Sequence, residues 1–256
     1  MIHIDPISAF SDNYIWCLHN DNGEAVVVDP GDAAPVEAFL TERSLKLTGV
    51  LITHHHFDHV GGLEALLQNR RIPVVGPPGA APQISRELSD GENVEALGVS
   101  FEVITVPGHT LDHIAYFAAA ESPPLLFCGD TLFAGGCGRL FEGTPEQMHH
   151  SLGKLKALPA ETQVYCAHEY TLTNLRFAQA VEPGSRALAE RFERESAKRQ
   201  REIPTVPSTI ALECATNPFL RSHVDEVQDT AGEYASMALN DEVATFAAVR
   251  HWKDNF

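Results

Sequence analysis

Four histidines and an aspartate fall within six residues, at positions 54–59, where the sequence reads HHHFDH. Imidazole and carboxylate groups are ligands of first-row divalent metal ions. In an extended segment alternate side chains point to the same side, so His54 and His56 share one side while His55 points away. This spacing predicts that the stretch supplies the larger part of a metal site.

The neighbouring sequence places this stretch at the end of a strand. The apolar run Gly49–Ile52 before it predicts a short buried strand, and sites in α/β proteins commonly lie where strands end. Three further candidate ligands follow strand-like segments in the same way, namely His109, Asp130 and His168. Strands that end at a common edge would gather these side chains despite their separation in the sequence.

The chain therefore offers two sets of three ligands with a carboxylate between them: His54, His56 and His109; Asp58, His59 and His168; and Asp130. One tetrahedral ion cannot use seven ligands, whereas two ions about 3.5–4 Å apart with a bridging water can. A purely structural zinc site is disfavoured, because such sites are closed and usually rich in cysteine. The alternative, that these histidines are ordinary polar residues at strand ends, does not explain their clustering.

Strands and helices alternate in the first two thirds of the chain. Seven segments have the composition or alternation of strands: Asn13–His19, Glu24–Pro30, Leu47–Thr53, Val99–Val106, His113–Ala118, Leu125–Cys128 and Gln163–Cys166. Helical spacing is found at Ala34–Arg43 and Val60–Asn69. A further helix is predicted to start at Thr144, because this residue can cap it and Pro145 suits the first helical position.

After Tyr170 the chain becomes predominantly helical, with helices predicted at Thr171–Val181, Ser185–Arg201, Asp225–Leu239 and Asp241–Trp252. We therefore expect an α/β metal-binding catalytic domain at residues 1–169 and an α-helical substrate-binding domain at residues 170–256. The six basic residues between positions 186 and 201 are interleaved with acidic residues, which predicts a solvated helix face.

The composition argues against nucleic acid and membranes as partners. The chain has 256 residues, and 18 Lys and Arg against 35 Asp and Glu give a formal charge of −17, which repels anionic polymers and lipids. No segment reaches the roughly 18 apolar residues needed to span a bilayer, and the first residues do not resemble a secretory signal. The five cysteines include no Cys-x-x-Cys pair, so we expect reduced thiols in a cytoplasmic protein.

Four motifs together resemble the metallo-β-lactamase fold: Thr53–His59, Pro107–Thr110, Gly129–Thr131 and His168–Tyr170. The resemblance to one family of that fold, glyoxalase II (hydroxyacylglutathione hydrolase), is closer and covers essentially the whole chain. It rests on more specific stretches: Asp12–Tyr14, Gly136–Gly143, Cys166–Thr171, Glu182–Gly184, Thr216–Phe219 and Arg250–Asp254.

This resemblance implies an αβ/βα four-layer sandwich followed by an α-helical domain. It also implies two divalent metal ions, zinc first with iron or manganese as alternatives, since His and Asp serve all three. The implied substrates are S-(2-hydroxyacyl)glutathione thioesters, notably S-D-lactoylglutathione, which is hydrolysed to D-lactate and glutathione in the second step of methylglyoxal detoxification. In the family the glutathione part is held by residues that match Arg139, Tyr170, Arg250 and Lys253. Phe141 stands where many relatives carry Tyr, so only its main chain is expected to contact substrate.

The chemistry that fits these residues is attack by a metal-bridged hydroxide on the thioester carbonyl, because bound metal lowers the pKa of water from 15.7 to about 7. Asp58 would orient this hydroxide. The leaving thiol has an ordinary pKa near 8.5 and departs without a dedicated acid. Arg250 and Lys253 lie three residues apart on a predicted helix and so share a face, which suits a carboxylate of glutathione. We expect the protein to act on this small molecule as a monomer.

Other activities of the same fold fit less well. A glutathione persulfide dioxygenase with a single iron would not need the second set of ligands. A nuclease is disfavoured by the acidic charge, and a β-lactamase by the lack of a proton donor for an amine leaving group. A metal-stabilised binding protein would not need so many ligands at an open site.

Overall fold

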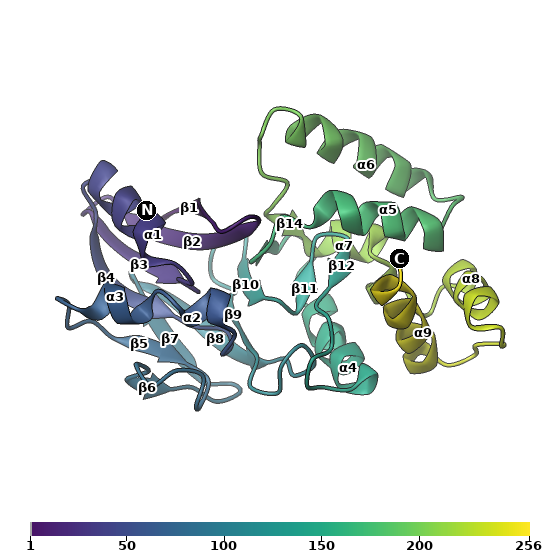
Figure 1. The fold of residues 1–256 in the computed structure, drawn as a ribbon, viewed down its shortest axis with the longest axis horizontal. Coiled ribbons are helices and arrows are strands. Elements are labelled where there is room, and N and C mark those ends of the chain that lie inside the picture. Colours follow the sequence, from purple (N-terminus) through teal and green to yellow (C-terminus); the bar gives the residue numbers. More distant parts are fainter. Residues whose placement is uncertain (1) are drawn as a thin grey trace. The chain divides into compact units, whose positions relative to one another are not determined.

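The computed structural model describes residues 2–256, which form two compact units (Figure 1). The first comprises the chain up to Thr105 together with Asp112–Gly129, and the second comprises Val106–Leu111 together with Asp130–Phe256. The α/β class predicted from the sequence is confirmed by a mixed sheet, further antiparallel strands and a helical C-terminal part. The division into residues 1–169 and 170–256 stays a prediction.

A six-stranded sheet carries the histidine-rich turn in the first unit. Its strands, in spatial order, are β1 (Ile2–Ala9), β2 (Asn13–Asn20), β3 (Glu24–Val28), β4 (Lys46–Leu51), β5 (Val74–Gly76) and β6 (Arg86–Glu87). The first three strands pair antiparallel and the last four pair parallel. Sequence patterning did not identify β1, which contains Pro6; proline is tolerated there because β1 is an edge strand.

Two helices cover one face of this sheet. Val36 and Leu40 of α1 (Ala33–Glu42) and Leu63 and Leu66 of α3 (Leu63–Leu67) are buried in one hydrophobic cluster with the inward-facing residues of the sheet. Burying one such side chain contributes about 1.5–3 kcal/mol to stability. The turn after β4 is therefore attached to a well-packed layer.

The continuous helix predicted at Val60–Asn69 is wrong. The chain instead forms α2 (Phe57–Val60) and α3, which are separated by Gly61 and Gly62. A Cβ atom on Gly62 would lie 2.5 Å from the carbonyl oxygen of Pro30, closer than real side chains approach. The glycine pair thus breaks the helix and lets the histidine-rich turn pack directly on the loop after β3.

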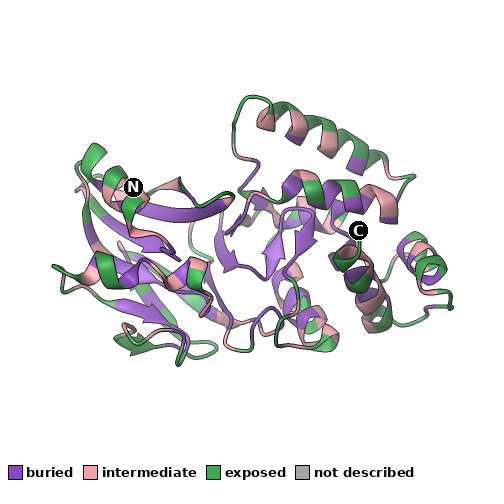
Figure 2. Ribbon diagram, viewed as in Figure 1, coloured by how far each residue is buried: buried purple, intermediate pink, exposed green. Residues whose placement is uncertain are grey.

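The first unit also contains four antiparallel strands in the spatial order β10 (Leu125–Gly129), β9 (Ile114–Ala118), β8 (Val99–Thr105) and β7 (Asn93–Ala96). Every residue of β9 and β10 is buried (Figure 2). Tyr116 of β9 donates a hydrogen bond to the carbonyl of Ile52 at 2.6 Å, and burial raises the pKa of its hydroxyl well above the ordinary value. This bond ties the strands to the chain immediately before the histidines.

The second unit contains short strands and most of the helices. Its elements are β11 (Leu132–Phe133), β12 (Gly136–Cys137), α4 (Pro145–Lys156), β13 (Gln163–Cys166), α5 (Thr171–Val181), α6 (Arg186–Arg199), β14 (Ser208–Thr209), α7 (Ile210–Thr216), η1 (Pro218–Leu220), α8 (Asp225–Ala235) and α9 (Glu242–Asp254). The predicted start of α4 is confirmed, because Thr144 and Gln147 form a reciprocal capping box. Helices α5 and α6 lie side by side (Figure 1).

Arg191 corrects the prediction of a solvated basic face on α6. Its side chain is only 1% exposed and pairs with Glu213 of α7, whose side chain is fully buried. The interleaving of charges indicated a helix with many ion pairs, but it could not show that α7 covers one of these positions. Arg186, by contrast, is exposed and pairs with Glu190 on its own helix, as predicted.

The cysteines are free thiols, four of them buried and Cys214 partly buried, in agreement with the sequence. Burial raises the pKa of the Cys166 thiol to about 12 and that of Cys137 to about 11. Within residues 2–256, no helix is long and apolar enough to cross a membrane.

Candidate metal centre

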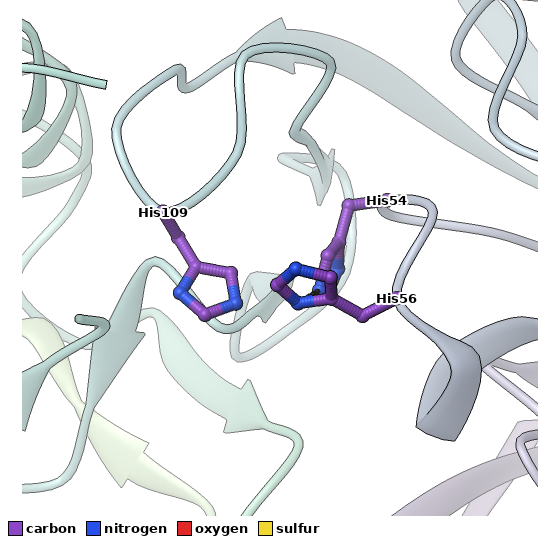
Figure 3. A group of neighbouring side chains, drawn as sticks. All are labelled: His54, His56 and His109. Carbon is purple, nitrogen blue, oxygen red and sulfur yellow. Dashed lines mark hydrogen bonds between the residues drawn. The ribbon is translucent and has the colours of Figure 1, made fainter. Parts of the chain in front are cut away.

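The turn after β4 carries four of the seven predicted ligands, all in the first unit. His54 and His59 are buried, and His56 and Asp58 are partly buried. Nε2 of His54 lies 3.1 Å from Nδ1 of His56, and Figure 3 shows both side chains extending from the same stretch of chain. Two imidazole nitrogens directed at one another in this way suit a shared cation. His55 is directed elsewhere and pairs with Asp112 at 2.9 Å.

A buried carboxylate that sequence analysis did not select, Asp29, organises this turn from the end of β3. It accepts hydrogen bonds from the backbone N–H of Thr53 at 2.7 Å, from the Thr53 hydroxyl at 2.7 Å and from Nδ1 of His59 at 3.0 Å. Because the Nδ1–H of His59 is directed to Asp29, Nε2 is left as the nitrogen that can bind metal. Asp29 lies within the segment Glu24–Pro30, which the sequence predicted only as a strand.

Asn13 positions the carboxylate of Asp58. The side-chain amide of Asn13, the first residue of β2, donates to Oδ2 of Asp58 at 2.9 Å. The same oxygen lies 3.5 Å from Nε2 of His59. On the opposite side, the backbone of Asp58 packs so tightly on Gly31 that a Cβ atom there would lie 1.8 Å from the Asp58 carbonyl oxygen. Both the backbone and the side chain of Asp58 are thus fixed.

Replacing Asn13 with alanine is expected to lower kcat by about 10-fold to 100-fold, the range for losing a group that orients a metal ligand. The fold should persist, because the backbone pairing of β1 with β2 is unaffected. Asn20→Ala is a matched control, since Asn20 makes the same amide–carboxylate bond, with Glu24 at 2.9 Å, at the other end of β2. Equal kcat values for the two variants would contradict this role of Asn13.

The other three predicted ligands, His109, Asp130 and His168, come together within the second unit, and all three are buried. Oδ2 of Asp130 lies 3.4 Å from Nε2 of His109, and Oδ1 lies 3.3 Å from Nε2 of His168. Each carboxylate oxygen thus faces a different imidazole. This is the arrangement expected of a carboxylate that two metal ions share.

The stretch 136–139 (Gly-Cys-Gly-Arg) holds His109 and Asp130 in place. Nδ1 of His109 donates to the carbonyl oxygen of Arg139 at 2.8 Å, which leaves Nε2 as the ligand atom. A Cβ atom on Gly138 would lie 2.0 Å from the carbonyl oxygen of Asp130 and 3.0 Å from Nδ1 of His109. Only glycine allows the chain to pass this close to both ligands.

Two of the predicted substrate-binding residues touch these ligands. The Tyr170 ring stacks on the ring of His168, with centroids 4.7 Å apart and planes at 6°. The Phe141 ring meets the ring of His109 edge-on at 5.3 Å and is 61% exposed. The backbone N–H of Phe141 donates to the carbonyl of His109 at 3.2 Å. While this bond is formed, that N–H does not donate to substrate.

The three predicted basic residues lie around Asp254, a residue that sequence analysis did not select. Oδ1 of Asp254 accepts from Nε of Arg139 at 3.3 Å and from Nη2 of Arg250 at 3.0 Å. Arg250 also donates to the carbonyl of Cys137 at 3.0 Å and is 6% exposed, far less open than expected for a helix end. Lys253 lies over the ring of Phe177 at 5.4 Å, and burial followed by the charge of Arg250 lowers its pKa.

Known proteins resemble both parts of the chain. The model of the metallo-beta-lactamase superfamily matches residues 13–168, and the model described as hydroxyacylglutathione hydrolase C-terminus matches residues 169–256. A protein of Pseudomonas aeruginosa named hydroxyacylglutathione hydrolase is 55% identical over 259 residues, which cover 100% of both chains.

Solved structures also resemble the chain. The structure of ETHE1 from Myxococcus xanthus has a TM-score of 0.58 and 30% identity, over 66% of this chain and 76% of that one. The structure of TTHA1623 in a di-iron-bound form has a TM-score of 0.61 and 26% identity, over 84% of this chain and 100% of that one. With the His and Asp donors described above, these likenesses support the use of divalent metal. The chain belongs to the hydroxyacylglutathione hydrolase (glyoxalase II) family of the metallo-β-lactamase superfamily.

Proposed function

We propose that the chain hydrolyses S-(2-hydroxyacyl)glutathione thioesters, with S-D-lactoylglutathione as its substrate and D-lactate and glutathione as products. A relative with this activity in its name is 55% identical over the whole chain. The structural observation that carries the proposal is Asp130, whose two oxygens face His109 and His168 separately. A carboxylate placed in this way can serve an ion on either side, as a metallohydrolase with two ions would use it.

The proposed metal ions are two zinc ions, with three ligands for each and Asp130 between them: His54, His56 and His109 for one, and Asp58, His59 and His168 for the other. The donor chemistry fits, because Nδ1 of His59 and of His109 is occupied by an acceptor and Nε2 is free of a proton. When bound, zinc would lower the pKa of water to about 7 and polarise the thioester carbonyl.

Within this site the protein orients the attacking water. The amide of Asn13 donates to Oδ2 of Asp58 and fixes the carboxylate, which would accept a hydrogen bond from the water and direct its oxygen at the carbonyl carbon. The leaving group is a thiol of ordinary pKa near 8.5, which departs as thiolate without a proton donor. The buried cysteines are unsuited to act as nucleophiles, because burial raises the pKa of Cys17 and Cys166 to about 12.

The glutathione part of the substrate would bind in the second unit. On a chain of charge −17, Arg139, Arg250 and Lys253 form a local basic cluster around Asp254, and a substrate carboxylate would take over part of the pairing that Asp254 now provides. Tyr170, stacked on His168, is placed to contact the substrate near the reacting group. All of these groups belong to one chain, so the proposal is that of an active monomer.

The double replacement Arg250→Ala with Lys253→Ala is expected to raise KM for S-D-lactoylglutathione by about 100-fold or more, since charged hydrogen bonds contribute about 1.5–3 kcal/mol each and each 1.4 kcal/mol is a factor of ten. KM should change more than kcat, because both side chains are proposed to hold the glutathione part of the substrate rather than the metal ions. The measurement compares this substrate with the S-D-lactoyl thioester of N-acetylcysteamine, which lacks both carboxylates of glutathione.

The shorter thioester should be hydrolysed by the double variant and by the wild type with the same KM. Arg186→Ala, which removes an exposed arginine of α6, serves as the control and should leave both substrates unaffected. If KM for the glutathione thioester does not change in the double variant, Arg250 and Lys253 are not part of the substrate site.

A glutathione persulfide dioxygenase with a single iron is the less favoured function. Full-length relatives at 51–55% identity carry the name hydroxyacylglutathione hydrolase. Such a dioxygenase would leave the ligands of the second ion without a purpose. Measuring activity as a function of the equivalents of metal added distinguishes the two functions, as described in the Discussion.

A further inference from the structure

The pair formed by Arg191 and Glu213 is the most buried ion pair whose role the hydrolysis does not explain, among residues 2–256. Nη2 of Arg191 lies 2.5 Å from Oε1 of Glu213, and neither side chain is more than 1% exposed. Arg191 also donates to Thr216 at 2.5 Å and to Ser208 at 3.2 Å. Apolar residues of similar volume often stabilise a protein as well as a buried ion pair does, which suggests that this pair does something besides stabilise α6 and α7.

The second oxygen of Glu213 binds the turn of the β11–β12 hairpin. Oε2 accepts from the backbone N–H of Gly135 at 2.8 Å and lies 3.0 Å from Nδ2 of Asn217. The same Nδ2 lies 3.2 Å from the carbonyl of Phe133 and 2.9 Å from that of Gly136. Glu213 thus accepts the N–H of Gly135, and Asn217 donates to the carbonyls of Phe133 and Gly136. Gly135, in the turn, has φ +70°.

The residues on either side of the hairpin contact two proposed metal ligands, Asp130 and His109. Asp130 precedes it, and the N–H of Gly138 closes its base by donating to the carbonyl of Thr131 at 3.2 Å. Gly138 then packs on the backbone of Asp130, and the carbonyl of Arg139 accepts the Nδ1–H of His109. A shift of the hairpin would therefore move the carboxylate of Asp130 and the acceptor that orients His109.

We propose that Glu213 and Asn217 are positioning residues for the metal centre, acting through the hairpin Leu132–Cys137 on Asp130 and His109. The ion pair with Arg191 fixes the side chain of Glu213, so that its other oxygen is directed at Gly135. This inference rests on the proposed function, because it takes Asp130 and His109 as metal ligands. It goes further by placing the control of those ligands in α7, far from the reacting atoms in the sequence.

Three variants test this role. Glu213→Gln replaces one of the two carboxylate oxygens with an NH₂ group, which cannot accept a hydrogen bond. The side chain can then no longer accept from Arg191 and Gly135 at the same time. Asn217→Ala removes the donor to the hairpin carbonyls and leaves the Arg191–Glu213 pair intact, so it is informative even if the first variant does not fold. The matched control is Glu182→Gln, because Glu182 is equally buried and pairs with Arg221 through two bonds of 2.8 Å, between α5 and the segment after η1.

Zinc affinity of the metal-free protein, measured by competition with a coloured chelator in the absence of substrate, is the main readout, with Tm, kcat and KM beside it. All three variants should have a lower Tm. Only Glu213→Gln and Asn217→Ala should weaken zinc binding by about 10-fold to 100-fold and lower kcat. Zinc affinities and kcat values within twofold of those of Glu182→Gln would overturn the proposal. A wild-type protein that binds no zinc would instead contradict the proposed function, and this inference with it.

Discussion

Replacing Asp130 with alanine is expected to lower kcat/KM for S-D-lactoylglutathione by about 10³-fold or more. Asp130 is the carboxylate that faces both His109 and His168, and its loss would leave each proposed ion one ligand short. Metal ions contribute several kcal/mol to transition-state stabilisation, and each 1.4 kcal/mol corresponds to a tenfold change in rate. Steady-state kinetics of the purified variant, together with its zinc content, measure this effect.

Asp112→Ala is the matched control for this substitution. Asp112 also pairs with a histidine, His55, at 2.9 Å, but neither residue belongs to the proposed ligand sets. Its removal should change kcat/KM by less than about threefold, as for most substitutions away from a functional site. Near-wild-type activity of Asp130→Ala would contradict the assignment of the shared carboxylate.

The second large effect is expected at Asp29, where alanine should lower the free energy of unfolding by about 3–5 kcal/mol and weaken metal binding. The substitution leaves three buried donors without their acceptor, two on Thr53 and one on His59, and each such group costs about 1–3 kcal/mol. It also removes the acceptor that fixes the tautomer of His59. Urea denaturation of the metal-free protein separates the loss of stability from the loss of metal.

Asp32→Ala gives the comparison for this variant, because Asp32 is a nearby aspartate that caps α1 through Ala34 at 3.0 Å. Loss of such a cap costs about 1 kcal/mol and should leave the affinity for metal unchanged. If Asp29→Ala is as stable as Asp32→Ala and binds metal as tightly as that variant does, the role assigned to Asp29 is wrong.

The sequence predicted those parts of the site that depend on local patterns. Alternation and apolar runs identified the strands that precede the ligand-bearing turns, and residue chemistry selected the candidate ligands. The partners that orient these ligands could not be found in this way, because they are distant in the chain. Asp29 lies 30 residues from His59, Asn13 lies 45 residues from Asp58, and Asp254 lies 115 residues from Arg139.

Helical periodicity likewise predicted α6 but not what packs against it. The buried position of Arg191 depends on Glu213, 22 residues later, in a helix that sequence analysis did not identify. Arg139, Tyr170, Arg250 and Lys253 were selected by family resemblance, and the local signal was limited to the shared helix face of Arg250 and Lys253. Their placement shows why such residues are hard to find, because the packing of Arg250 on Phe219 at 4.9 Å depends on tertiary contacts.

The most direct test is to titrate the metal-free protein with zinc and to follow hydrolysis of S-D-lactoylglutathione without oxygen. A hydrolase with two metal ions should have no activity when the metal is fully removed and reach full activity near two equivalents of zinc. D-lactate and glutathione should be released in equal amounts. Full activity with one equivalent of iron and a requirement for oxygen, or hydrolysis that survives complete removal of metal, would contradict the proposed activity and site.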